Sequence, residues 1–212
     1  MNNTEQLKKE ISDIGKRLYA KGFSPGHSGN ISVRSGSHIL VTPSGMNLGD
    51  VQPQDVVEVD FDGNFALSGK KPTSEKIMHL GIYKERPDVN AIVHCHAPKS
   101  SAFAVAGVPL DAPILAENVF VLGQVPIVQY AMPSSNELAQ SVSSCFKTHD
   151  AVLMANHGVA VAGNGLSDAY YKLETLEYYA EVYLYAKLLG RTNELSKEEV
   201  QKIIELRAVF GK

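Results

Sequence analysis

Short apolar runs that are typical of β-strands alternate with helical patterns along this chain, and the alternation restricts it to an α/β fold. The strand-like runs cover residues 30–34, 38–42, 56–67, 90–95 and 151–163, the last as a pair of strands. Asp62-Gly63 predicts a hairpin turn inside the third run. No linker, repeat or sharp change of composition separates these segments, so we predict one domain over residues 1–212.

The helical patterns are defined by apolar periodicity and by end signals. Leu7, Ile11, Ile14 and Leu18 form one apolar stripe at spacings of four, three and four, and Gly22 can terminate that helix. Further helices are predicted from Thr73 or Ser74 to about Arg86, over residues 100–107, from about Ser135, and from 166 to Gly190 as the final helix.

Charge and cysteine content exclude several classes of protein. The net charge is −3 and Lys and Arg are scattered, which argues against a nucleic-acid partner. Residues 1–22 mix acidic and basic side chains without an apolar run, so neither a signal peptide nor a membrane anchor is predicted. The two cysteines form no disulfide framework, and we expect a cytoplasmic protein with no membrane partner.

His94 and His96 stand one residue apart at the end of an apolar run. Successive side chains of a strand point to opposite faces, so the two imidazoles share one face and Cys95 occupies the other. Both rings can reach one metal ion, but a pair of hydrogen-bonded structural histidines fits the motif equally well. Cys95 is predicted to be a core residue rather than a ligand.

His157 also follows an apolar run, and Gly158 directly after it would let the backbone turn sharply and leave room beside the ring. Together His94, His96 and His157 would make an open three-histidine site for a divalent ion. Zinc is the first choice, because imidazole ligands and Lewis-acid chemistry suit it.

Thr73, Ser74 and Glu75 stand where a helix is predicted to begin, and free backbone N–H groups at such a position favour anions. Glu75 could be an ordinary capping carboxylate or a catalytic one. His79 would face the same side four residues later and could equally be a buried structural histidine, so we place it outside the metal site.

Two further segments are suited to binding an oxyanion. "GHSGN" at residues 26–30 has glycines flanking small polar groups, and "TPSG" at residues 42–45 is a proline-containing turn with a hydroxyl and a glycine. Each alone is a common turn. Three polar segments in one chain with the histidine set predict a phosphate site.

The motifs "GHSGNISVR", "TPSG", "KPTSE", "VHCHA" and "ANHG" resemble, in order and spacing, those of the class II aldolase/adducin family, from about residue 5 to about residue 190. The resemblance implies a three-layer α/β/α sandwich around a mostly antiparallel sheet. It also implies a homotetramer with the site at a subunit boundary. The partner would be a small phosphorylated sugar or sugar acid.

The family pattern assigns a role to each matching residue. It implies one Zn²⁺ per subunit on His94, His96 and His157, with Glu75 as the acid/base. The phosphate-binding positions of the family correspond to Asn30, Ser44, Gly45, Thr73 and Ser74. The implied reaction is zinc-dependent cleavage of a phosphorylated ketose resembling L-fuculose 1-phosphate, through a metal-stabilised enediolate, to dihydroxyacetone phosphate and an aldehyde.

One departure from the family pattern leaves alternatives open. An ungapped comparison puts Leu115 where the family's fuculose-phosphate aldolases carry a tyrosine, and Glu117 is the nearest ionisable candidate. A 3-oxo-tetronate 4-phosphate decarboxylase needs no such residue and is the second interpretation. A sugar-phosphate 4-epimerase is a weaker one, because that branch resembles an aspartate at the position of Glu75. A non-catalytic adducin-like scaffold has no need of three zinc-spaced histidines.

Overall fold

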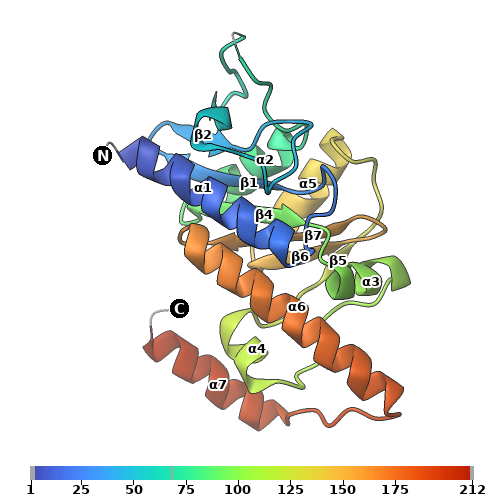
Figure 1. Ribbon diagram of the computed structural model, residues 1–212. Helices are drawn as coiled ribbons and strands as arrows, with labels where there is room; N and C mark the ends of the chain where they lie inside the picture. The colour runs from blue at the N-terminus through green and yellow to red at the C-terminus, as the bar shows by residue number, and fades with distance from the viewer. Residues whose placement is uncertain (1–2, 68, 211–212) are drawn as a thin grey trace.

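The computed structural model describes residues 3–67 and 69–210, so the outermost residues of the predicted domain lie outside the described part. Its centre is a seven-stranded sheet in the order β3-β2-β1-β4-β7-β6-β5 (Figure 1). The strands are β1 Asn30–Ser35, β2 His38–Val41, β3 Val57–Asp60, β4 Ala91–Cys95, β5 Ile127–Val128, β6 Ala151–Met154 and β7 Gly158–Gly163. Only β5 and β6 pair in parallel among these strands, which confirms the mostly antiparallel sheet.

Helices cover both faces of the sheet, which confirms the three-layer architecture. One layer contains α1 Asn3–Ala20, α3 Pro98–Ala106 and α6 Leu166–Leu188, and the other contains α2 Lys76–Glu85 and α5 Asn136–Cys145. A single turn of 3₁₀ helix, Pro53–Asp55, precedes β3. Two more helices, α4 Ala116–Val121 and α7 Lys197–Val209, pack on each other beyond α6 (Figure 1).

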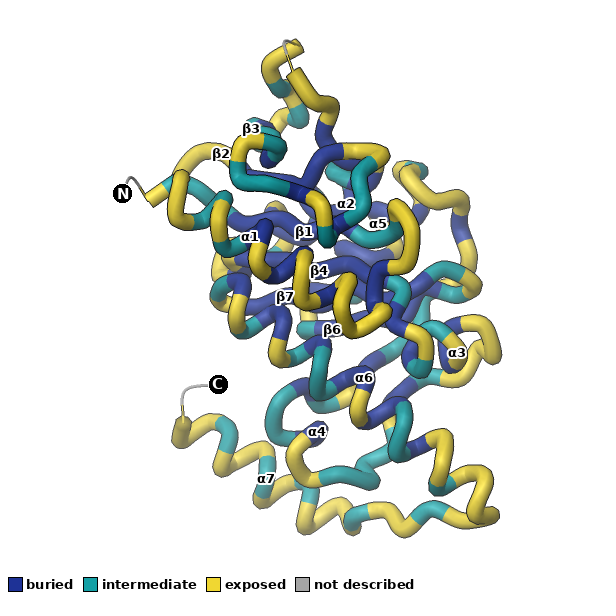
Figure 2. The backbone as a smooth tube through the Cα atoms, viewed as in Figure 1, coloured by how far each residue is buried: buried dark blue, intermediate teal, exposed yellow. Residues whose placement is uncertain are grey.

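The central strands are buried on both faces (Figure 2). In β4, Ala91, Val93 and Cys95 belong to the apolar cluster beneath α1 and α6, whereas Ile92 belongs to the cluster beneath α2 and α5. The alternation confirms Cys95 as a core residue. It also directs His94 toward the α2 side of the sheet.

β1 departs from this pattern in one respect. Ile31 and Val33 enter the cluster beneath α1, but the alternate positions are the buried polar residues Asn30 and Ser32. Asn30 is the direct pairing partner of His94. Opposite residues of an antiparallel pair share a face, so polar side chains of β1 lie beside the histidine on the α2 side.

Several predicted helix ends are present in the structure. Gly22 follows α1 with φ +72°, and Gly190 follows α6 with φ +90°, a left-handed conformation that glycine adopts without steric cost. Ser135 caps α5 by accepting a hydrogen bond from the Leu138 N–H at 3.1 Å. None of the described helices has the length and apolar character needed to cross a membrane.

Two sequence predictions were wrong. At Asp62-Gly63 a turn does form, with the Gly63 N–H donating to the Asp60 carbonyl at 3.0 Å, but no second strand follows it and the chain leaves the sheet after β3, so the predicted hairpin is absent. The helix ending before Gly190 is not the last, since α7 follows it. The start of α7 carries a sequence signal that was missed, because Ser196 and Glu199 form a capping box, although no described residue of this helix is buried.

Candidate metal centre

Two of the three predicted ligands come from β4. His94 lies within the strand between Asn30 of β1 and Ala160 of β7 and is fully buried, whereas His96 follows the end of the strand. The backbone N–H of His96 donates to the Phe23 carbonyl at 2.9 Å, which fixes the chain as it leaves the sheet. Strand alternation therefore presents both imidazoles on the α2 side.

His157 lies in the tight turn between β6 and β7. Its backbone N–H donates to the Met154 carbonyl at 3.0 Å, and Asn156 adopts the left-handed conformation with φ 56°. The prediction that Gly158 supplies the sharp turn was wrong, because Asn156 does so; asparagine tolerates this conformation better than most residues.

Gly158 is instead required for close packing beside the ligands. A Cβ atom at this position would lie 2.5 Å from the Cys95 carbonyl oxygen and 2.8 Å from Cδ2 of His96. The sequence predicted that Gly158 leaves room beside the ring of His157. In the structure the missing side chain leaves room for the ring of His96 instead. A side chain here would push β7 away from the end of β4.

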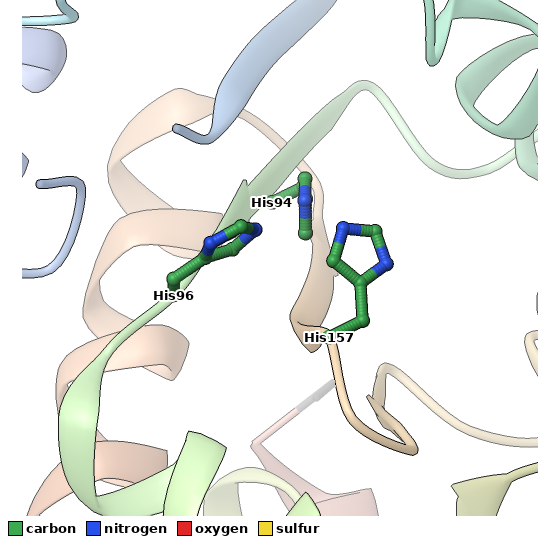
Figure 3. Close-up of side chains that lie close together, drawn as sticks. All are labelled: His94, His96 and His157. Atoms are coloured by element: carbon green, nitrogen blue, oxygen red, sulfur yellow. The ribbon is translucent and has the colours of Figure 1, made fainter. Parts of the chain in front are cut away.

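The three rings face one another (Figure 3). Their centroids are 5.1 Å apart for His94 and His96, 4.8 Å for His94 and His157, and 5.1 Å for His96 and His157. One nitrogen from each ring lies within 4.8 Å of the others. Within residues 3–67 and 69–210 this is the only such group of histidine, cysteine and acidic side chains.

The residues fit a divalent cation by the chemistry of their buried atoms. His94 Nδ1 donates to the Val159 carbonyl at 2.8 Å, which leaves Nε2 as the nitrogen that faces the cluster. Without a cation Nε2 carries a proton toward Glu75 Oε2 at 3.1 Å, and a bound cation would take the place of that proton. Three further buried atoms here have no hydrogen-bond partner: His96 Nε2, His157 Nδ1 and Glu75 Oε1. Buried polar atoms without partners are costly, and a cation would satisfy them.

Glu75 extends its carboxylate into this cluster from the residue before α2. Oε2 lies 3.1 Å from His94 Nε2, and Oε1 lies 3.5 Å from His157 Nε2. The side chain makes no capping hydrogen bond to α2. Of the two roles open from the sequence, the capping role is therefore wrong.

The start of α2 is also later than predicted. The Thr73 N–H donates to the Thr42 carbonyl at 3.1 Å, and Pro43 and Pro72 form an isolated β-bridge. Because residues 72–73 are extended, the helix begins at Lys76 rather than at Thr73 or Ser74. The extended backbone before α2 places the Glu75 carboxylate against the histidines.

The charges of the cluster are coupled. Burial alone would raise the pKa of Glu75, but the positive charge of His94 and the hydrogen bond from Asn30 hold it well below its usual range. Burial opposes the charge of His94, yet the Glu75 carboxylate raises the pKa of that histidine. Burial and the charge of His94 lower the pKa values of His96 and His157 to about 4. At neutral pH these two rings are uncharged, the form that binds a metal.

The candidate phosphate residues gather near Glu75. The Ser44 N–H donates to the Lys71 carbonyl at 2.9 Å, which holds the turn containing Gly45 beside the entry to α2. Thr73 Oγ1 accepts from the Glu75 N–H at 3.3 Å, and Ser74 Oγ accepts from the Ser134 hydroxyl at 2.8 Å. Ser44, Gly45 and Ser74 are exposed. Their role in binding phosphate stays a prediction.

Asn30 is already engaged on two sides. Its amide Nδ2 donates to Glu75 Oε2 at 2.9 Å, and its Oδ1 is hydrogen-bonded to His79 Nε2. Its second amide N–H has no partner among the described residues. Sequence reasoning missed this contact between Asn30 and Glu75, although a polar residue at a core position of β1 was the available signal.

Glu117 is not brought to the histidines. It is exposed in the first turn of α4, a helix that packs on α6 and α7. No hydrogen bond or ion pair joins it to the cluster in the part of the chain that the structure describes. Leu115, just before α4, packs against the core.

We expect Gly158→Ala to weaken metal binding through His96. The added methyl group must displace the Cys95 carbonyl or the His96 ring, at a cost of about 1–3 kcal/mol in unfolding free energy. The zinc affinity, measured by competition with a chelator, should fall together with the free energy of unfolding. Gly165→Ala is the matched control, because a Cβ there meets nothing within 4 Å and its φ of −179° suits any residue. Equal zinc affinity in the Gly158→Ala and wild-type proteins would contradict this role.

Comparison with known proteins gives the family. A family model described as Class II Aldolase and Adducin N-terminal domain matches residues 9–184. An L-fuculose phosphate aldolase of Methanococcus maripaludis is 40% identical over 165 residues, covering 78% of this chain and 89% of that protein. A 3-oxo-tetronate 4-phosphate decarboxylase of Haemophilus influenzae is 35% identical over 186 residues, covering 85% of this chain and 88% of that protein. The solved structure of an L-fuculose 1-phosphate aldolase gives a TM-score of 0.88 at 32% identity, covering 94% of this chain and 95% of that protein.

The matched range contains every strand of the sheet and the three clustered histidines. Aldolases and decarboxylases are both lyases, so the relatives support a lyase, and their names include enzymes of sugar phosphates. The chain therefore belongs to the class II aldolase and adducin family.

Proposed function

We propose that this protein is a zinc-dependent aldolase that cleaves a phosphorylated ketose, resembling L-fuculose 1-phosphate, to dihydroxyacetone phosphate and an aldehyde. The observation that carries the proposal is the set of buried, unpaired histidine nitrogens with the Glu75 carboxylate against them. Three ligands leave a coordination position open for a substrate, as in catalytic rather than structural zinc sites. The carboxylate beside them suits proton transfer.

The proposed roles follow from where each group lies. His94, His96 and His157 would hold the zinc, and the Val159 carbonyl keeps His94 in the tautomer that binds it. When bound, the metal supplies Lewis-acid chemistry, drawing electron density from a substrate carbonyl. Glu75 would remove a proton from, or return it to, the carbon beside that carbonyl.

The substrate's phosphate would be held by the polar segments around the entry to α2. The proposed groups are the free N–H of Asn30, the hydroxyls of Ser44, Thr73 and Ser74, and the backbone of Gly45. Gly45 has φ +73° and is exposed, and a Cβ atom at this position would meet nothing within 4 Å, so there is room for a ligand beside its backbone. A fixed phosphate orients the carbon chain relative to Glu75.

A decarboxylase is the second candidate, and the surroundings of Leu115 favour it. Loss of CO₂ from a β-keto acid requires charge stabilisation at the same carbon but no residue to deprotonate a hydroxyl group. Leu115 cannot move a proton, and Glu117 lies on α4 without a contact to the cluster. In the aldolase, Glu117 would have to provide the proton transfer at the aldehyde end.

The deciding experiment is incubation of the zinc-loaded protein with phosphorylated four-, five- and six-carbon ketoses and keto acids. Dihydroxyacetone phosphate and CO₂ are scored in the same samples, with chelator-treated protein as the blank. The aldolase proposal expects dihydroxyacetone phosphate without CO₂. Dihydroxyacetone phosphate together with an equal amount of CO₂ would establish the decarboxylase instead, because loss of CO₂ from a 3-oxo-tetronate 4-phosphate also leaves dihydroxyacetone phosphate. A zinc-loaded protein that turns over none of them would contradict both.

Dephosphorylated forms of any accepted substrate test the phosphate assignment. We expect their kcat/KM to fall by about a hundredfold or more, because the fixed phosphate supplies binding energy and orientation. Inorganic phosphate should compete with the phosphorylated substrate. Equal kcat/KM for a sugar and its phosphate would contradict the assignment.

A further inference from the structure

A continuous series of buried polar side chains runs from β1 and α2 to the Glu75 carboxylate. The Tyr83 hydroxyl lies 2.9 Å from Ser32 Oγ, which lies 2.7 Å from His79 Nδ1. His79 Nε2 is hydrogen-bonded to Asn30 Oδ1, and Asn30 Nδ2 is 2.9 Å from Glu75 Oε2. All five residues are buried.

The carboxylate fixes the direction of the nearest hydrogen bonds. An ionised Glu75 can only accept, so the amide nitrogen of Asn30, rather than its oxygen, faces it. The amide oxygen of Asn30 then faces His79, and this oxygen also can only accept. His79 Nε2 must therefore carry a proton.

The protonation state of His79 fixes the direction of the remaining hydrogen bonds in the series. The ring is fully buried, and burial together with the charge of His94 lowers its pKa to about 3, so it is neutral at physiological pH. A neutral ring protonated on Nε2 has a lone pair on Nδ1, which accepts from Ser32 Oγ. The Ser32 oxygen in turn accepts from Tyr83, whose pKa burial raises, so that it keeps its proton.

We infer that His79 is a positioning residue, which locks the Asn30 amide so that Asn30 donates to Glu75. This inference rests on the proposed catalytic role of Glu75. Every hydrogen bond from Tyr83 to Glu75 points the same way, so reversing the Asn30 amide would place two acceptor oxygens, of Asn30 and Glu75, against each other. His79 opposes the same reversal from the other side, because its Nε2 proton would then face the amide N–H groups of Asn30.

The location of this series argues against simple core packing. Its members occupy the layer between β1 and α2, where Ile39, Val41 and Ile82 are apolar neighbours. Apolar residues would fill that layer without the cost of burying polar groups. A fully satisfied buried network, in contrast, defines one geometry for each member.

The first test is the tautomer of His79 in the wild-type protein. Long-range proton–nitrogen NMR of protein labelled with ¹⁵N in histidine distinguishes protonated from unprotonated ring nitrogens. We expect His79, assigned by its loss in His79→Gln, to be neutral and protonated on Nε2. A proton on Nδ1 alone, or on both nitrogens, would overturn the inference without affecting the aldolase proposal.

The second test separates positioning from stability. His79→Leu should lower kcat, and the exchange of the C3 proton of dihydroxyacetone phosphate in D₂O, by about tenfold or more, with KM changed less than about threefold. Zinc content should remain at the wild-type level, because His79 touches no ligand. His79→Gln should recover part of the rate, since its amide can donate to Asn30 and accept from Ser32.

Phe146→Leu is the control for this second test. Phe146 is buried in the same apolar cluster beneath α2 and α5, so its replacement lowers stability without touching the polar series. Its exchange rate should stay within about twofold of wild type. Equal rate losses in His79→Leu, His79→Gln and Phe146→Leu would assign His79 to stability alone and overturn the inference. If His79→Leu does not fold, His79→Gln and the tautomer measurement decide.

Discussion

Replacement of Glu75 by glutamine is expected to slow turnover on the order of a hundredfold or more while the fold and most of the zinc remain. The amide keeps the shape of the carboxylate but cannot exchange a proton at neutral pH. Since Glu75 makes no capping hydrogen bond to α2, little stability should be lost with its charge. Exchange of the C3 proton of dihydroxyacetone phosphate in D₂O isolates the proton transfer from the chemistry of the aldehyde.

The matched control is Glu85→Gln, the same substitution in the last turn of the same helix. Glu85 lies 3.4 Å from Lys147 in an exposed pair, so its loss should change neither exchange nor zinc content. If the Glu75→Gln protein exchanged the C3 proton at the wild-type rate, Glu75 would not be the base. Glu117 would then be the next residue to replace.

Replacement of His157 by alanine is expected to remove zinc and activity together. Two imidazoles from β4 would remain, and the protein would lose the only ligand from the other side of the site. Loss of a residue that merely supports a ligand costs about 10–100-fold in metal affinity, so loss of a ligand itself should exceed this range. Zinc content after dialysis and affinity measured against a chromophoric chelator give the result directly.

His38→Ala controls for the loss of an imidazole, because His38 is exposed on β2 and its ring is hydrogen-bonded only to the neighbouring Ser37 among the described residues. It should retain full zinc content. Circular dichroism of the His157→Ala protein establishes that any zinc loss does not result from unfolding. A folded His157→Ala protein with a full equivalent of zinc would exclude His157 from the ligand set.

Local sequence rules predicted the parts of the fold that depend on local geometry. Strand alternation places His94 and His96 on one face with Cys95 behind them, since that depends only on the two-residue period of β4. The end of α6 likewise follows from one glycine. In contrast, α4 is a single short segment with little pattern to detect. For α7 the capping box of Ser196 and Glu199 was an available signal that was not used.

The surroundings of Glu75 depend on contacts between distant segments. Its position against His94 needs the pairing of Thr42 with Thr73, and its hydrogen bond from Asn30 needs β1 to lie beside β4. No local rule joins such residues. The same holds for Gly158, where the sequence indicated a special backbone but only the packing against Cys95 shows why a side chain is excluded.

The proposed ligands come from β4 and its end and from the turn between β6 and β7, so a bound metal would link metal supply to folding. His94 and His157 meet only when β4, β7 and β6 are paired, so an unfolded chain has no comparable site. An ion present at a hundred times its dissociation constant adds about 2.7 kcal/mol to the free energy of unfolding, a large share of what holds a typical domain together. The cell's free zinc would then govern how long each molecule survives proteolysis as well as how many molecules are active.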